Sequence, residues 1–360
     1  MKSWLLGFLA AAVATGATAQ DNVVNVYNWS DYIAEDTLDK FTAETGIAVN
    51  YDVYDNNAVV EAKLLAGNSG YDVVVPTANF LERQIKAGVF QPLDKSKIPN
   101  FSGLSDALLE DVAVHDPNND HAAIYTWGTT GLGYNVGKVN ERIDNAPTDS
   151  FALLFDPQYA EKLADCGIAL IDEAPDIYSS ALAYLGLDPN SNDAADIDKA
   201  QELLNGVRPH IRYFNSSQYI NDLANGDVCL AFGYSGDILQ ARDRADEADN
   251  GVEVAYAIPK EGAVLWFDML AVPADAPNPD NAHAFIDFLL KPEIMAALSN
   301  YVFYANPVPA SEPMVSDEVK TDPGIYPAPE VAANLFTLEA KDARSDRRIN
   351  RAFTRLKSGR

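Results

Sequence analysis

The chain has 360 residues, of which 48% are hydrophobic, and a formal net charge of −27 at pH 7. This apolar content can form hydrophobic cores, which excludes an intrinsically disordered chain, and the length predicts about two domains. So acidic a protein is not expected to bind nucleic acid or an anionic membrane surface, because both carry phosphates that would repel it.

The N-terminus has the features of a secretory signal peptide. Lys2 is followed by the apolar run Trp4–Val13 and by Ala17–Ala19, a small-residue cleavage site. The apolar run is too short to cross a bilayer as a helix, and no later stretch is apolar enough to do so. We therefore expect residues 1–19 to be removed, which leaves 360 − 19 = 341 residues as an exported, soluble protein.

The first part of the mature chain alternates between strand and helix patterns. Strands are predicted at Val23–Tyr27, Val49–Val53 and Tyr71–Val75, and helices at Ile33–Thr45, Ala58–Ala66 and Leu81–Ala87. A glycine follows each of these helices, as is common at helix ends. Strands that alternate with helices predict a parallel, doubly wound α/β sheet.

Polar and aromatic side chains follow the first strand, namely Trp29, Ser30, Asp31 and Tyr32. Ligands of open α/β sheets bind beyond the carboxyl ends of the strands, so this segment is a candidate binding site. A carboxylate pairs with a cation, and each ring can add about 0.5–2 kcal/mol through cation–π contact. The alternative is that Trp29 and Tyr32 only cover the sheet edge and Asp31 only caps the next helix.

Thr77 and Asn79 follow the third strand and are expected at the same rim of the sheet. Two loops at one edge are a stronger indication of a site than one loop. Thr77 could instead be a helix N-cap, which is the commoner role of threonine before a helix.

The second half of the chain is predicted to form another α/β lobe. The glycine-rich segment Trp127–Tyr134 is interpreted as an extended crossover between lobes, and Ala255–Pro259 as a candidate second crossover. Between and beyond them, strands are predicted at Ile168–Ile171, Val228–Phe232 and Val264–Leu270, and helices at Asp149–Phe155, Ser179–Leu185, Asp196–Leu204 and His283–Leu290.

Acids accompany the strands of this half as well. One predicted loop carries Glu173 and Asp176, and another carries Tyr234 and Asp237. Asp268 lies inside an apolar strand, where an unpaired carboxylate would be costly, so we expect it to meet a cation or several hydrogen-bond donors.

The candidate ligand set therefore combines carboxylates with aromatic rings from both lobes. The acids are Asp31, Glu173, Asp176, Asp237 and Asp268, and the rings are Trp29, Tyr32, Tyr234, Trp266 and Tyr304. Amines are protonated at neutral pH, so such a set suits a linear organic dication with acids at its ends and rings along its methylenes.

Catalytic motifs are absent from the sequence. The four histidines are scattered, and neither an HExxH nor a GxSxG motif occurs. The segment Asp188–Asp193 begins like a calcium loop but lacks the glycine and the bidentate glutamate that such a loop requires. We therefore predict no enzymatic activity, no metal site and no cofactor.

The chain contains two cysteines, Cys166 and Cys229. An even count in an exported protein indicates a disulfide, and two buried free thiols are the alternative.

Several long stretches give the chain a recognisable resemblance. They are Tyr27–Ile33, Phe80–Gln84, Gly88–Asp94 and Ser217–Asp227. Through them, and over nearly the whole mature chain, it resembles the periplasmic polyamine-binding proteins of ABC transporters, closest to the putrescine type and with the spermidine type as a relative. The resemblance implies an α/β fold of two lobes, each a mainly parallel sheet flanked by helices, that close on a ligand in the cleft between them.

The resemblance also implies boundaries and roles. One lobe would hold residues 20–127 with about 260–300, and the other residues 128–259 with about 301–360. A ligand-binding role is implied for Trp29, Ser30, Asp31, Tyr32, Thr77, Asp176, Tyr234, Asp237, Trp266, Asp268 and Tyr304. Cys166 and Cys229 match a pair that looks like the disulfide of this family.

Some positions depart from the putrescine type. Thr77 stands in place of Ser, Asp176 in place of Glu, Tyr234 in place of Trp and Trp266 in place of Phe. Glu173 replaces a small residue, and the spermidine type carries an acid there and a Trp matching Trp266. Glu173 could thus serve the third ammonium of spermidine, or it could be a solvated loop carboxylate.

We therefore predict a monomeric periplasmic protein that captures putrescine or spermidine and delivers it to permease subunits in the inner membrane. The first alternative is a protein that presents polyamines to a sensory or chemotaxis receptor. A weaker alternative is an extracytoplasmic enzyme that acts on an amine.

Overall fold

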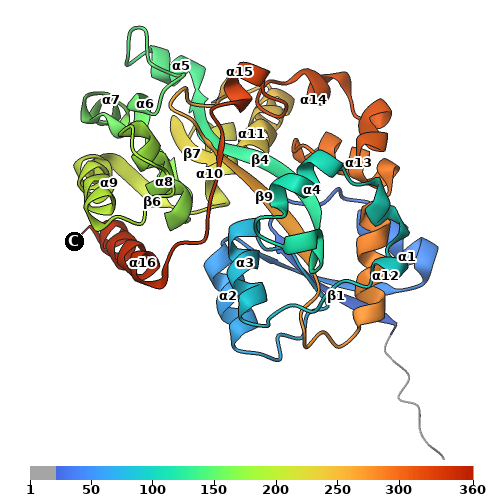
Figure 1. The fold of residues 1–360 in the computed structure, drawn as a ribbon. Coiled ribbons are helices and arrows are strands. Elements are labelled where there is room, and N and C mark those ends of the chain that lie inside the picture. The colour runs from blue at the N-terminus through green and yellow to red at the C-terminus, as the bar shows by residue number, and fades with distance from the viewer. Residues whose placement is uncertain (1–21, 360) are drawn as a thin grey trace, which may run out of the picture.

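A computed structural model describes residues 22–359, so the predicted signal peptide lies outside the described part of the chain. The strands form one ten-stranded sheet with the central order β2-β1-β3-β9-β4-β7-β5-β6. In Figure 1 the long strands β4 and β9 pass between two groups of helices, one group around each end of the sheet. The predicted α/β class is confirmed, and no helix among the described residues is long and apolar enough to cross a membrane.

The first lobe contains the predicted alternation of strands and helices. The strands are β1 (Val23–Trp29), β2 (Ala48–Tyr54) and β3 (Val73–Val74), and the helices are α1 (Thr37–Thr45), α2 (Asn57–Leu65) and α3 (Ala78–Lys86). β1 pairs in parallel with both β2 and β3, as predicted. The helix α1 begins later than predicted, because residues 30–36 form a turn in which Asp31 has a φ of 52°.

The central strands are antiparallel rather than parallel. They are β4 (Ala122–Asn135) and β9 (Val264–Ala271), which pair with each other along most of their length. β9 also pairs with β3, and β4 with β7, so the two strands join the lobes. The predicted crossover at Ala255–Pro259 instead begins as the short strand β8 (Val254–Ala257) along β4.

The second lobe is built on the parallel strands β5 (Ile168–Leu170), β6 (Ile211–Phe214) and β7 (Leu230–Tyr234). Its larger helices are α8 (Ala174–Tyr184), α9 (Ala194–Val207), α10 (Gln218–Ala224) and α11 (Ser235–Ala248). The prediction that Asp176 and Asp237 lie in loops is wrong, since both residues lie in the first turns of helices, α8 and α11. Pro175 occupies the start of α8, where a missing N–H is tolerated.

Among residues 22–359, the remaining elements are nine α-helices and the short strand β10, which pairs with β9. They are α4 (Asp106–Val112), α5 (Val136–Asn140), α6 (Ala152–Phe155), α7 (Pro157–Leu163), α12 (Pro279–Leu289), α13 (Pro292–Val302), α14 (Asp317–Thr321), α15 (Pro329–Ala332), β10 (Phe336–Thr337) and α16 (Ala343–Ser358).

Two large hydrophobic cores correspond to the two lobes. The first joins β1, β3 and β9 to α12 and α13, and the second joins β5 and β7 to α8, α9 and α16. The lobe boundaries stay a prediction, although Val302, Tyr304, Val308 and Leu338 of the segment assigned to the second lobe pack in the first core.

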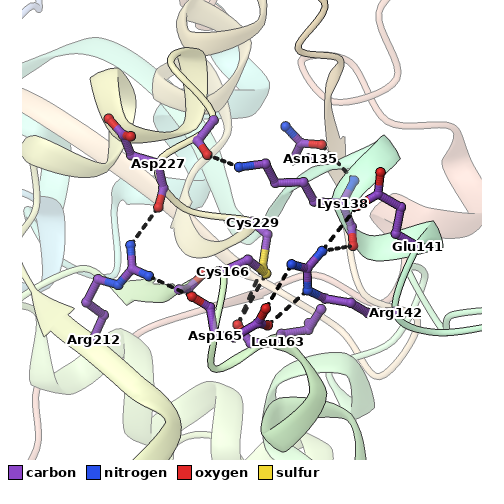
Figure 2. The surroundings of a disulfide bond; sticks show 12 residues. Asn135, Lys138, Glu141, Arg142, Leu163, Asp165, Cys166, Arg212, Asp227 and Cys229 are labelled. Atoms are coloured by element: carbon purple, nitrogen blue, oxygen red, sulfur yellow. Dashed lines mark hydrogen bonds and ion pairs between the residues drawn. A yellow bond between two sulfur atoms is a disulfide. The ribbon is translucent and has the colours of Figure 1, made fainter.

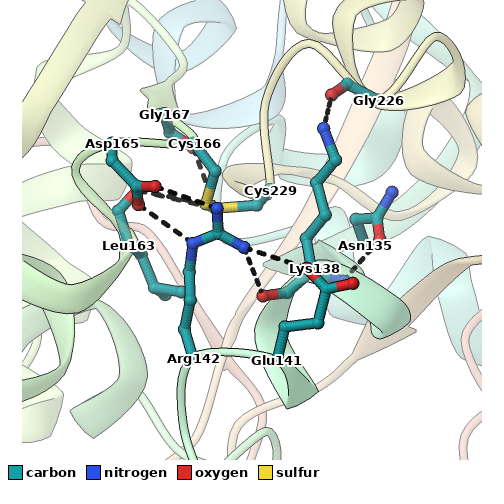
Figure 3. Close-up of polar contacts among 10 residues, drawn as sticks. All are labelled: Asn135, Lys138, Glu141, Arg142, Leu163, Asp165, Cys166, Gly167, Gly226 and Cys229. Carbon is teal, nitrogen blue, oxygen red and sulfur yellow. Dashed lines mark hydrogen bonds and ion pairs between the residues drawn. A yellow bond between two sulfur atoms is a disulfide. The ribbon is translucent and has the colours of Figure 1, made fainter.

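Cys166 and Cys229 form the predicted disulfide, with Cα atoms 5.6 Å apart. Figure 2 shows the bond between the turn after α7 and the segment before β7, beside the bonds from Arg212 to the backbone oxygens of Asp165 and Asp227. Figure 3 shows Arg142 bound to both carboxylate oxygens of Asp165 at 2.9 Å. The disulfide thus joins two segments that both belong to the second lobe.

Candidate ligand-binding site

A pocket lies where the two lobes meet the central strands. Its lining residues are Trp29, Ser30, Tyr32, Tyr54, Asn57, Thr77, Asn79, Phe80, Asp176, Ser216, Ser217, Ile220, Tyr234, Asp237, Trp266, Asp268, Tyr304 and Leu338. Ten of the twelve predicted ligand residues are in this set, and Asp31 and Glu173 are the exceptions.

Asp268 is the acid that the central strand β9 contributes. One carboxylate oxygen accepts a hydrogen bond from the hydroxyl of Thr77 at 2.7 Å, and the other accepts one from Tyr32 at 2.8 Å. Burial raises the pKa of Asp268 to about 7, although both hydroxyl donors oppose the rise and Asp176 and Asp237 add to it. Thr77 has the position of a helix N-cap but makes no capping bond, because its hydroxyl serves Asp268.

Asp237 lies in the first turn of α11, in the second lobe. Its two oxygens accept hydrogen bonds from Tyr304 at 2.6 Å and from Tyr219 at 2.7 Å. Burial raises its pKa to about 6. Gly236 allows this packing, because a Cβ there would lie 2.6 Å from the ring of Tyr304.

Asp176, in the first turn of α8, is the third acid of the pocket. It accepts a hydrogen bond from the Thr130 hydroxyl at 2.7 Å, and burial raises its pKa to about 6. No lining residue is Lys, Arg or His. Three buried acids without a basic partner among the lining residues make the pocket suited to a cation.

Aromatic rings enclose the space between these acids. Tyr234 packs edge-on against Trp266 at 5.7 Å and against Trp29 at 6.3 Å between ring centroids. Tyr304 likewise meets Trp266 at 5.1 Å and Tyr32 at 5.3 Å. The indole N–H of Trp266 is buried without a hydrogen-bond partner. Such a set of rings can hold apolar methylenes and the flanks of an ammonium group.

Asp31 does not line the pocket. Its side chain is 45% exposed and pairs with Arg244 of α11 at 3.1 Å. The turn that carries Ser30 and Tyr32 into the pocket therefore places the intervening acid on the surface, where it links the two lobes.

Glu173 is buried, with 3% of its surface exposed, but it does not line the pocket. One carboxylate oxygen accepts a hydrogen bond from the backbone N–H of Asn57 at 2.7 Å. Burial raises the pKa of Glu173 well above its usual range, and Asp176 adds to the rise.

Several lining residues were not predicted from the sequence. Tyr54 ends β2 beside Trp29, so the same argument from strand ends could have found it. Ser216 and Ser217 follow β6, a strand that was not predicted. Asn57 and Phe80 lie in the first turns of helices and carried no comparable signal.

Within residues 22–359, no three His, Cys, Asp or Glu side chains gather as a metal site requires.

Comparison with known proteins agrees with this geometry. The family model described as bacterial extracellular solute-binding protein matches residues 36–328. The putrescine-binding periplasmic protein of Escherichia coli is 53% identical, over 99% of this chain and 98% of that protein. A putrescine-binding periplasmic protein of Pseudomonas aeruginosa is also 53% identical, with the same coverage.

A solved structure shows the same architecture. The spermidine/putrescine ABC transporter substrate-binding protein of Streptococcus pneumoniae superposes with a TM-score of 0.75 and 28% identity, over 94% of this chain and 99% of that one. This likeness confirms the predicted two-lobed fold.

Proposed function

The chain belongs to the bacterial extracellular solute-binding proteins, and from this premise we propose that it captures a polyamine, putrescine or spermidine, in the periplasm. As a monomer, it then delivers the ligand to the permease subunits of an ABC transporter in the inner membrane. One observation carries the choice of ligand: three buried carboxylates and a set of aromatic rings line a pocket that contains no basic side chain.

The ligand joins acids from different parts of the fold. Asp268 belongs to a central strand, and Asp176 and Asp237 begin helices of the second lobe. An ammonium group that approaches any of these acids neutralises a carboxylate that is otherwise buried without a cation. The aromatic rings then cover the methylenes, and binding favours the closed arrangement of the lobes.

The preferred polyamine depends on the residues that differ from the putrescine type. Trp266 and Tyr234 shape the wall of the pocket, and Asp176 has a shorter reach than the Glu it replaces. We propose that putrescine binds and that spermidine is accepted in the same slot, since proteins named for both ligands share the fold.

Calorimetry against putrescine, cadaverine, spermidine and spermine tests this proposal, with the neutral analogue 1,4-butanediol as the control. Putrescine or spermidine should bind, and the uncharged diol should not. If none of the polyamines binds, the proposed ligand class is wrong.

Two further measurements separate the alternatives. Polyamine recovered unchanged after release excludes an enzyme that acts on amines. Cells that lack the protein should lose polyamine uptake, whereas loss of a chemotactic response with intact uptake would instead indicate a sensory protein.

A further inference from the structure

We propose that Glu173 is a positioning residue that holds the two lobes closed, rather than a direct contact for a third ammonium group. The inference rests on the proposed function, because it concerns how the closed form retains a polyamine.

The contact of Glu173 joins elements from opposite lobes. Glu173 immediately precedes α8 in the second lobe, and Asn57 is the first residue of α2 in the first lobe. The carboxylate oxygen lies 2.7 Å from the Asn57 nitrogen, and both residues are buried. The carboxylate is therefore already engaged with the first lobe and is not among the groups that face the pocket.

Asn57 connects this contact to the ligand-binding acids. Its side-chain amide donates to the Thr77 hydroxyl at 3.0 Å and accepts from the Thr77 backbone N–H at 3.1 Å. The same hydroxyl donates to Asp268 at 2.7 Å. The carboxyl group of Glu173 therefore bonds Asn57, and Asn57 in turn orients the Thr77 hydroxyl that donates to Asp268.

This bond exists only when the lobes are together. If the lobes separate, Glu173 and the Asn57 N–H both return to water. A ligand that closes the lobes gains this contact whatever its length, so losing it should weaken every polyamine by a similar factor. A direct role toward a third ammonium would instead weaken spermidine alone.

Glu173→Ala, measured by calorimetry with putrescine and with spermidine, tests the proposal. Both affinities should fall by about tenfold, as expected when the buried Asn57 N–H loses its hydrogen-bond acceptor. Glu173→Gln keeps an acceptor oxygen and should stay within about threefold of the wild type. The loss should appear as faster release of both ligands, with the association rate and the thermal stability of the ligand-free protein nearly unchanged.

Asp172→Ala is the matched control. Asp172 is the adjacent acid on the same segment, but it pairs with Lys357 at 2.6 Å within the second lobe. Both polyamine affinities should be unchanged in this variant.

A double-mutant cycle isolates the backbone donor. Asn57→Ala removes the side chain and keeps the N–H, whereas Asn57→Pro removes both. Proline is compatible with the first position of α2, and Asn56 before it is extended, with φ −156° and ψ 153°. Glu173→Ala should weaken binding in the Asn57→Ala background and have no further effect in the Asn57→Pro background.

The outcomes separate the two proposals. If the wild type binds no polyamine, the proposed function fails. If the wild type binds but Glu173→Ala binds equally well, or loses affinity for spermidine alone, only the role of Glu173 as a closing contact is overturned.

Discussion

At the scale of single residues, the pocket acids have hydrogen-bond donors but no Lys, Arg or His beside them among the described lining residues. Asp268 and Asp237 each receive two hydroxyl hydrogen bonds, and burial still raises the pKa of both acids. Hydroxyl donors orient the carboxylates without neutralising them. A ligand ammonium can therefore form the charge pair that the folded protein lacks.

The first prediction is that Asp268→Asn nearly abolishes polyamine binding. The amide keeps the size of the side chain but removes the charge, and losing one partner of a buried pair costs about 3–5 kcal/mol, or roughly two to four decades in affinity. Calorimetry measures the loss, and circular dichroism checks that the fold is retained. Binding within about threefold of the wild type would show that Asp268 does not contact the ligand.

The second prediction concerns the exposed pair of Asp31 and Arg244. Exposed ion pairs contribute about 0.2–1 kcal/mol, so Asp31→Asn and Arg244→Gln should each change polyamine affinity by no more than about fivefold. Because the two side chains act on each other, the double variant should be no weaker than either single variant. A loss of about a hundredfold in Asp31→Asn alone would restore the direct ligand role that the sequence predicted.

At the scale of elements, the acids of the second lobe depend on where two helices begin. Asp176 and Asp237 occupy the first turns of α8 and α11, where the helix dipole favours a negative charge. Burial nevertheless dominates, because the pKa of each is raised to about 6. The first turns of the two helices fix the positions of the acids. Burial by the surrounding pocket residues sets their affinity for a proton or an ammonium group.

The third prediction is that the disulfide stabilises the second lobe without changing the affinity for the ligand. It closes a loop with a sequence separation of 63 residues, so replacing both cysteines with alanine should lower the free energy of unfolding by up to about 4–5 kcal/mol. Chemical denaturation measures the loss, and calorimetry below the unfolding range should give an unchanged polyamine affinity. Two thiols titrated in the unfolded, unreduced wild type would contradict the bond itself.

At the scale of the whole molecule, ligand and proton compete for the same three acids. The pKa of Asp176, Asp237 and Asp268 is about 6, 6 and 7 in the folded protein, against an ordinary value of 3.8. Between these limits the folded state binds more protons than the unfolded state. The contribution of these acids to stability is therefore complete below about pH 4 and is lost as the pH rises towards 7.

The fourth prediction follows from this loss of stability with rising pH. The difference in unfolding free energy between the ligand-free wild type and Asp268→Asn should shift against the wild type as the pH rises from about 4 to 7. Over this range the unfolded wild type releases a proton from position 268 that the folded protein keeps, whereas the asparagine of the variant does not titrate in either state. The stabilisation of the wild type by putrescine should grow over the same range. Thermal unfolding of both proteins across this range measures the effect, and a difference independent of pH would contradict it.

The sequence alone predicted the disulfide, from an even cysteine count in an exported chain. It also predicted the α/β class, the order of strands and helices in the first lobe and many of the residues that line the pocket. These latter features depend on local patterns: alternation within strands, glycine after helices, and acids or rings where strands end. Trp29, Thr77 and Asp268 were found in this way, because the end or the interior of a buried strand restricts where a side chain can lie.

The positions of the Asp31 and Glu173 side chains follow from the tertiary structure and not from the sequence. Both are acids in the expected segments, yet one turns to the surface towards Arg244 and the other bonds the Asn57 N–H, 116 positions away in the chain. Sequence patterns place a residue on an element, but the direction of its side chain depends on what the opposite lobe presents. That partner exists only after distant segments have packed together, so no local pattern contains it.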